Sequence, residues 1–77
     1  MTPQPPHAVR VTLDEVLAAR DMSLSELARR VDITYANLSV LKMGHARAIR
    51  FTTLAAICRE LECQPGDLLS YDSEPAQ

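Results

Sequence analysis

Apolar residues recur every three or four positions along most of the chain, which is the spacing of amphipathic helices. Each such segment follows a serine or threonine, the residue types that best cap a helix N-terminus. In the first two segments a glutamate three residues later completes the sequence of a capping box. The proline at position 65 suits the first turn of a short fifth helix. The four predicted capping residues are Thr12, Ser23, Thr34, and Thr52 or Thr53.

The ends of the predicted helices are marked as clearly as their starts. Asp32 stands where the second helix must turn, and aspartate tolerates the left-handed conformation better than most residues. Gly44 is placed as the glycine that ends the third helix, and the residue before Pro65 closes the fourth. Before the first helix, residues 7–11 alternate apolar and polar side chains with the period of a short strand. An isolated strand needs a partner, which we expect near Leu69–Tyr71 or in a second chain.

The apolar positions of these helices are sufficient for one small core. Together they predict an all-α fold, a compact bundle of five helices with a short terminal strand. The predicted core residues are Leu13, Val16, Leu17, Ala19, Leu24, Leu27, Ala28, Val31, Ile33, Leu38, Leu41, Phe51, Leu54, Ile57, Cys58, Leu61, Leu68 and Leu69.

The second and third helices are separated by only three residues, 32–34. Such a short connection makes two helices cross steeply, and Ala28 provides the small side chain that the crossing requires. The exposed face of the third helix then carries little charge, which is unusual for a helix face in contact with water alone. Asn37 can pair with adenine, Ser39 with a base or phosphate, and the methyl groups of Val40 with thymine.

Charge is distributed unevenly, although the net charge is only −2. Residues 27–59 hold six basic residues and one acid, whereas the rest of the chain holds two basic residues and nine acids. This basic middle segment favours an electrostatic field that attracts one kind of partner. The alternative interpretation is that a few surface charges are placed there by chance.

Composition excludes several functional classes. The longest apolar run has five residues, too few to cross a membrane, and we expect no signal peptide. Two cysteines and two histidines make a zinc site improbable, and the spacing of Cys58 and Cys63 does not put both thiols on one helical face. With two glycines and no nucleophile motif, the chain is not expected to be an enzyme or to hold a cofactor. The default location is the cytoplasm.

The helix-turn-helix segment resembles a known family. Residues 23–31, SLSELARRV, resemble the second helix of the Cro/repressor-like (Xre-type) proteins, and residues 33–44, ITYANLSVLKMG, resemble their recognition helix with its terminal glycine. The AIRF at 48–51 and the CQPGDLL at 63–69 are similar to a small bacterial single-domain branch. The resemblance implies a five-helix DNA-binding domain at 9–71, between an arm at 1–8 and an acidic tail at 72–77. Its implied role is a sequence-specific regulator of transcription that binds double-stranded DNA as a homodimer, with repression as the expected effect.

The resemblance also implies which residues contact DNA. The base-reading positions would be Tyr35, Ala36, Asn37, Ser39, Val40 and Met43. The phosphate-binding positions would be Ser23, Ser25, Thr34, Lys42, Arg47 and Arg50. Two residues depart from the pattern of the family. Asp32 replaces the usual glycine, and Lys42 stands where an acid is common, so an internal ion pair there is absent or reversed.

A rival function belongs to another class. The same bundle serves in protein-interaction modules, such as an antitoxin or an accessory domain. Affinity for duplex DNA as a function of salt separates the two, because phosphate contacts release counterions and protein contacts do not.

Overall fold

The computed structural model describes residues 8–71, so most of the predicted arm and all of the predicted tail lie outside the described residues. Within this range the prediction of a five-helix fold with short strands is confirmed. No helix among residues 8–71 has both the length and the apolar character needed to cross a membrane. The elements are β1 (Val9–Val11), α1 (Leu13–Ala19), α2 (Leu24–Arg30), α3 (Tyr35–Lys42), α4 (Phe51–Leu61), α5 (Pro65–Leu68) and β2 (Leu69–Tyr71).

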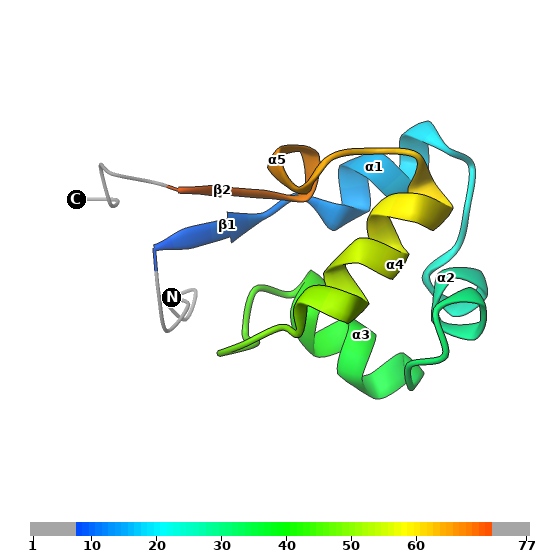
Figure 1. Ribbon diagram of the computed structural model, residues 1–77, viewed down its shortest axis with the longest axis horizontal. Helices are drawn as coiled ribbons and strands as arrows, with labels where there is room; N and C mark the ends of the chain where they lie inside the picture. Colours follow the sequence, from blue (N-terminus) through cyan, green and yellow to red (C-terminus); the bar gives the residue numbers. More distant parts are fainter. Residues whose placement is uncertain (1–7, 72–77) are drawn as a thin grey trace.

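The two strands form a small antiparallel sheet that projects from one end of the helical body (Figure 1). Val9 lies opposite Tyr71 and Val11 opposite Leu69. The predicted strand therefore pairs within its own chain, next to α1 and α5. Thr12, between β1 and α1, joins this region to the end of α5, because its backbone N–H donates to Leu68 O at 2.8 Å.

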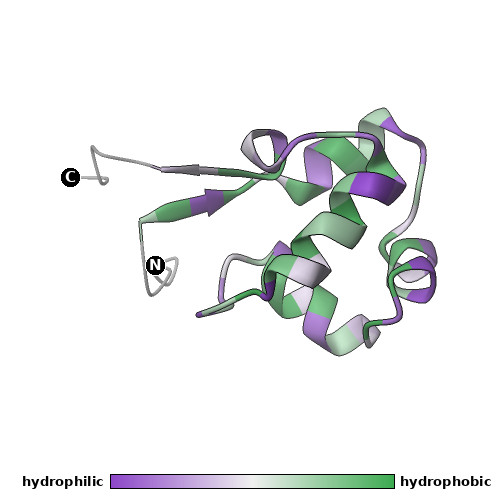
Figure 2. Cartoon of the chain, viewed as in Figure 1, coloured by the Kyte–Doolittle hydropathy of each residue, from purple (hydrophilic) through white to green (hydrophobic). Residues whose placement is uncertain are grey.

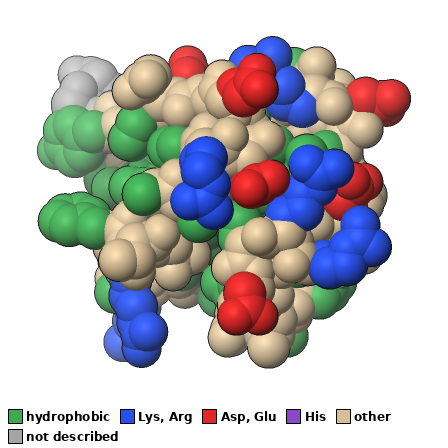
Figure 3. Space-filling model, turned by 45° about the vertical axis from the view of Figure 1, so that its right-hand side comes forward, with side chains coloured by type: hydrophobic (Ala, Val, Ile, Leu, Met, Phe, Trp, Pro, Cys, Tyr) green, Lys and Arg blue, Asp and Glu red, His purple; other side chains and the backbone are tan. Residues whose placement is uncertain are grey.

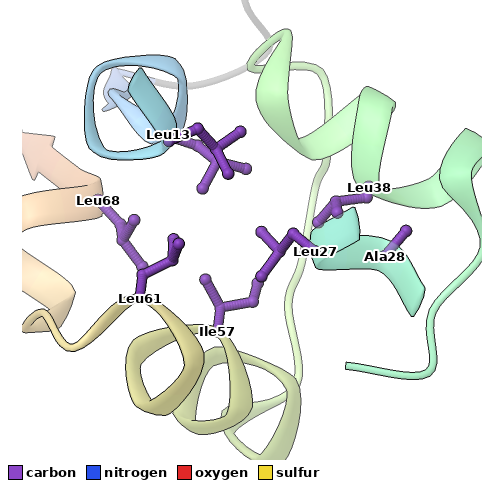
Figure 4. Close-up of a cluster of buried hydrophobic side chains, with 8 residues drawn as sticks. Leu13, Leu27, Ala28, Leu38, Ile57, Leu61 and Leu68 are labelled. Atoms are coloured by element: carbon purple, nitrogen blue, oxygen red, sulfur yellow. The ribbon is translucent and has the colours of Figure 1, made fainter. Parts of the chain in front are cut away.

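The core lies between the five helices, which turn their apolar sides toward one another (Figure 2). In Figure 4, leucines and one isoleucine from all five helices point into a common space, with Leu27 and Ile57 at its centre. Because these side chains come from every helix, removing any one of them weakens contacts between several elements. The buried residues are Leu13, Leu17, Leu27, Ala28, Leu38, Ile57, Leu61 and Leu68.

The predicted capping box at the start of α1 is wrong. Thr12 makes no side-chain cap, and its hydroxyl donates instead to Asp67 O at 2.8 Å. The threonine is placed at the seam between β1 and α5, so its hydroxyl serves a contact between elements far apart in sequence. The caps by Ser23 and Thr34 follow the prediction: Ser23 Oγ accepts from Glu26 N–H and Thr34 Oγ1 from Asn37 N–H, both at 3.1 Å. The other half of the capping box predicted at α2 is wrong, because the Glu26 carboxylate accepts from Arg30 instead.

The start of α4 also differs from the prediction. The helix begins at Phe51, with Arg50 as its N-terminal flanking residue and no side-chain cap, rather than at Thr52 or Thr53. Phe51 was expected in the core, yet it is 85% exposed. In the first turn of α4 its side chain lies over a groove on the surface rather than against the helices. Ala19, another expected core residue, is exposed at the end of α1.

A polar contact holds the end of α1 against the end of α4. Arg20 Nε donates to Leu61 O at 2.6 Å, and its NH2 group donates to Glu62 O at 2.9 Å. These carbonyls belong to the last residues of α4 and have no partner within the helix. Arg20 satisfies them, and so fixes the corner where α1, α4 and α5 meet.

Candidate nucleic-acid interface

The connection between α2 and α3 is tight and conformationally fixed. Asp32 adopts the predicted left-handed conformation, with φ 57°, and Ile33 N–H donates to Ala28 O at 3.1 Å. Thr34 then caps α3. Leu27 and Ala28 on α2 and Leu38 on α3 are buried between the helices. Side chains on the opposite side of α3 therefore face outward.

The exposed side of α3 matches the predicted base-reading face. Tyr35 is 55% exposed, Val40 44% and Met43 58%, while Leu38 on the other side is fully buried. Tyr35 and Val40 lie on α3, and Met43 is the residue that ends the helix. Three of the predicted base-reading residues are therefore large side chains that solvent reaches.

Three smaller residues complete this face. Ala36 and Asn37 are exposed in the first turn of α3, and the Asn37 side chain has no hydrogen bond among residues 8–71. Ser39 is half-buried, and its hydroxyl makes a weak contact with Met43 Sδ at 3.9 Å. Asn37 is thus the polar side chain best placed to offer both an amide donor and an acceptor to a partner.

A groove of about 490 Å³ runs between α3 and the loop that follows it. Asn37 and Val40 line it from α3, and Arg47 and Arg50 line it from the loop. The loop can leave α3 sharply because Gly44 takes a φ of 80°, a left-handed value that favours glycine. Two arginines that sequence places ten or more residues after Asn37 therefore lie beside it.

Several of the basic residues are already paired with acids. Arg30 forms ion pairs with Glu26 and Glu60, and the hydrogen bond and charge of Glu26 raise the pKa of Arg30. Lys42 Nζ lies 3.6 Å from Asp14 Oδ1. The ion pair expected to be absent or reversed at position 42 is therefore reversed, with the lysine on α3 and the acid on α1.

These pairs offset part of the basic charge predicted for residues 27–59. Arg59 also lies 3.5 Å from Glu60, so acids from outside residues 27–59 offset half of the six basic side chains. Figure 3 shows acidic and basic side chains interspersed on the face it displays. Within residues 8–71, Arg29, Arg47 and Arg50 have no acidic partner. Two of these three lie in the groove beside α3.

The predicted phosphate-binding residues fall into two groups. Arg47 and Arg50 are exposed and close to the reading face. The remainder lie at helix ends: the hydroxyls of Ser23 and Thr34 accept capping bonds and keep a proton to donate. Ser25 is exposed in the first turn of α2. Sequence reasoning missed Asp14, which holds Lys42 by an ion pair, and no pattern in the sequence signalled that contact.

Comparisons with known proteins agree with this geometry. The profile of the Cro/C1-type HTH DNA-binding domain matches residues 12–74. The chain is 58% identical over 67 residues to the Bacillus subtilis (strain 168) protein named "Uncharacterized HTH-type transcriptional regulator YozG", covering 87% of this chain and 80% of that protein. It also resembles the crystal structure of the transcriptional regulator VanUg, with a TM-score of 0.69 and 27% identity, covering 96% of this chain and all of the other.

Proposed function

Because the chain belongs to the Cro/C1-type family of helix-turn-helix DNA-binding domains, we propose that it is a sequence-specific regulator of transcription. In this proposal α3 enters the major groove of double-stranded DNA, and binding in the cytoplasm represses the genes that carry its site. Both similar proteins are named as transcriptional regulators, which supports the regulatory role.

One observation carries the proposal: Asn37 and Val40 of the reading face line the same groove as Arg47 and Arg50, which have no acidic partner among residues 8–71. An α-helix with its side chains is about 10–12 Å in diameter, and the major groove, about 12 Å wide, can admit it. Asn37 presents the amide that pairs with adenine, while Val40 and Ala36 present methyl groups suited to thymine. Arg47 and Arg50 supply the phosphate contacts that position a reading helix without themselves specifying sequence.

We further propose that the chain acts as a homodimer. One helix-turn-helix contacts too few base pairs for useful specificity in a genome, and a two-fold dimer doubles the site. The small sheet offers a place for a second copy beside it, because β2 is an edge strand of a two-stranded sheet. Tyr71, at the end of β2, is 74% exposed. Half-sites are then expected about 34–36 Å apart, one turn of DNA.

Selection of binding sites from random duplexes tests the proposal. The full chain is incubated with a random-sequence library at near-physiological salt, and bound duplexes are amplified and sequenced over several rounds. We expect enrichment of an inverted repeat whose half-sites are centred about one helical turn apart. A single enriched half-site would contradict the dimer, and no enrichment over the starting library would contradict sequence-specific binding.

The salt dependence of binding separates the proposal from a protein-interaction role. Each phosphate neutralised by the protein releases counterions, so affinity for the selected duplex should fall steeply as salt rises. Weak DNA binding that hardly changes with salt would instead favour the protein-interaction module.

A further inference from the structure

Cys58 and Cys63 lie together at the end of α4, although their spacing does not place both on one face of a continuous helix. The helix stops before Cys63, because Glu62 adopts a left-handed conformation with φ 52° and ψ 55°. Cys63 N–H then donates to Cys58 O at 3.0 Å, and Glu62 N–H to Arg59 O at 3.3 Å. This pair of bonds is a Schellman motif, in which the two outer residues bring their side chains into contact.

The two cysteines lie close together at this turn. The Schellman bond joins the backbone of Cys63 to that of Cys58, and both side chains pack against the core and line the same groove. Partial burial raises the pKa of Cys63, the charge and hydrogen bond of Cys58 raise it further, Asp67 adds to the effect, and Arg20 opposes it. The pair is therefore a dithiol brought together by the turn at Glu62, rather than two separate cysteines.

The backbone on both sides of the cysteines is held by hydrogen bonds to other parts of the chain. Arg20 bonds to the carbonyls of Leu61 and Glu62, which lie between the two cysteines. On the far side, Gln64 N–H donates to Asp67 Oδ2 at 2.8 Å and starts α5. Groups held in this way need little further ordering before they react with each other.

The dithiol is also accessible from outside. Both cysteines are half-buried and line an open groove of about 580 Å³ along α4, together with Phe51, Leu54 and Pro65. Because the groove is open, a small molecule in solution can reach both side chains. A free cysteine usually serves as a small hydrophobic residue, and both cysteines pack against the core, but each also keeps part of its surface open to solvent.

We propose that Cys58 and Cys63 form a reversible intramolecular disulfide by exchange with a small-molecule disulfide. After losing its proton, Cys58 attacks one sulfur of that molecule, the old S–S bond breaks, and one thiolate leaves. Cys63 then gives up its proton and attacks the Cys58 sulfur of the mixed disulfide, which releases the second thiolate. The protein loses two electrons and two protons, and the small disulfide gains both as two thiols. The product fixes the turn between α4 and α5.

Equilibration with glutathione tests the proposal. The full chain is held in buffers of stepped reduced-to-oxidised glutathione ratio, quenched with acid, and analysed by intact mass, once in native buffer and once in concentrated urea. Because the folded turn brings the two cysteines together, we expect the equilibrium constant for the internal disulfide to be at least about tenfold larger in native buffer than in urea. The Cys58→Ser and Cys63→Ser variants serve as matched controls and should stop at the mixed disulfide with one glutathione.

Three results would overturn it. An equal or smaller constant in native buffer would mean that the fold does not favour the bridge. A mixed disulfide as the final product of the native wild-type chain would mean that the second thiol does not attack. Disulfide-linked dimers in native buffer would mean that the cysteines react between chains. The comparison of the wild-type chain in two solvents decides the matter even where a serine variant folds poorly.

Discussion

Replacement of Leu38 by alanine, compared with the same replacement at Val40, tests the orientation of α3. Leu38 is fully buried between α2 and α3, whereas Val40 is 44% exposed on the opposite side. Removing a buried leucine side chain leaves a cavity and costs roughly 2–5 kcal/mol. A chain of this size has a stability of about 4–12 kcal/mol, at roughly 0.05–0.15 kcal/mol per residue. The Leu38→Ala change should therefore remove a large part of the stability, and Val40→Ala should cost about 1 kcal/mol or less.

Thermal unfolding followed by circular dichroism measures the difference. For a domain of 60–100 residues, each kcal/mol lowers the midpoint by about 4–8 °C, so Leu38→Ala should melt at least about 8 °C below the wild-type chain. Val40→Ala should melt within a few degrees of the wild-type chain and show its effect on DNA binding instead. Equal melting of the two variants would refute the reasoning, because the helix would then be rotated about its axis relative to the core.

The remaining predictions concern the caps, the loop and the sheet. Ser23→Ala and Thr34→Ala each remove a capping bond and should lower the unfolding free energy by about 0.5–2 kcal/mol, measured by urea denaturation; no change would mean that solvent replaces the cap. Arg47→Ala and Arg50→Ala should weaken binding to every duplex and reduce the slope of log affinity against log salt by about one each, and an unchanged slope would remove that residue from the phosphate contacts. Deleting residues 1–11 removes β1, so we expect sedimentation to show less dimer and melting to show lower stability; a truncated chain as dimeric and as stable as the full one would exclude β1 from assembly.

Much of the fold followed from local signals in the sequence. The positions of α2 and α3 were predictable because capping residues, apolar spacing and the left-handed turn at Asp32 all act within a few residues of one another. Gly44 marked the end of α3 and Pro65 the start of α5 for the same reason, whereas α4 ends at Leu61, earlier than the residue before Pro65 that was predicted to close it. The failures came from contacts between distant residues. Thr12 has the sequence of a cap but bonds to Asp67, 55 residues away.

The candidate site shows the same division. The exposed face of α3 was predictable from helical periodicity, because burial of Leu38 fixes which side faces outward. The pairing of the charges around this face could not be predicted from the sequence. The ion pair between Lys42 and Asp14 joins two helices, and the sequence contained no sign of which acid would reach that lysine. The contact between Cys58 and Cys63 was missed because helical spacing was assumed through a position where the helix had ended.

The central claim is that α3 reads base sequence, and Asn37 tests it most directly. We would measure by fluorescence anisotropy, at one fixed salt concentration, the affinity of the wild-type and Asn37→Ala chains for the selected duplex and for a scrambled duplex. Glu62→Gln, at the far end of α4, serves as the control. If Asn37 contacts a base, the variant should lose about 1–3 kcal/mol on the selected duplex and little on the scrambled one, while the control should behave like the wild-type chain. Equal losses on both duplexes, or no loss on either, would contradict sequence reading by α3.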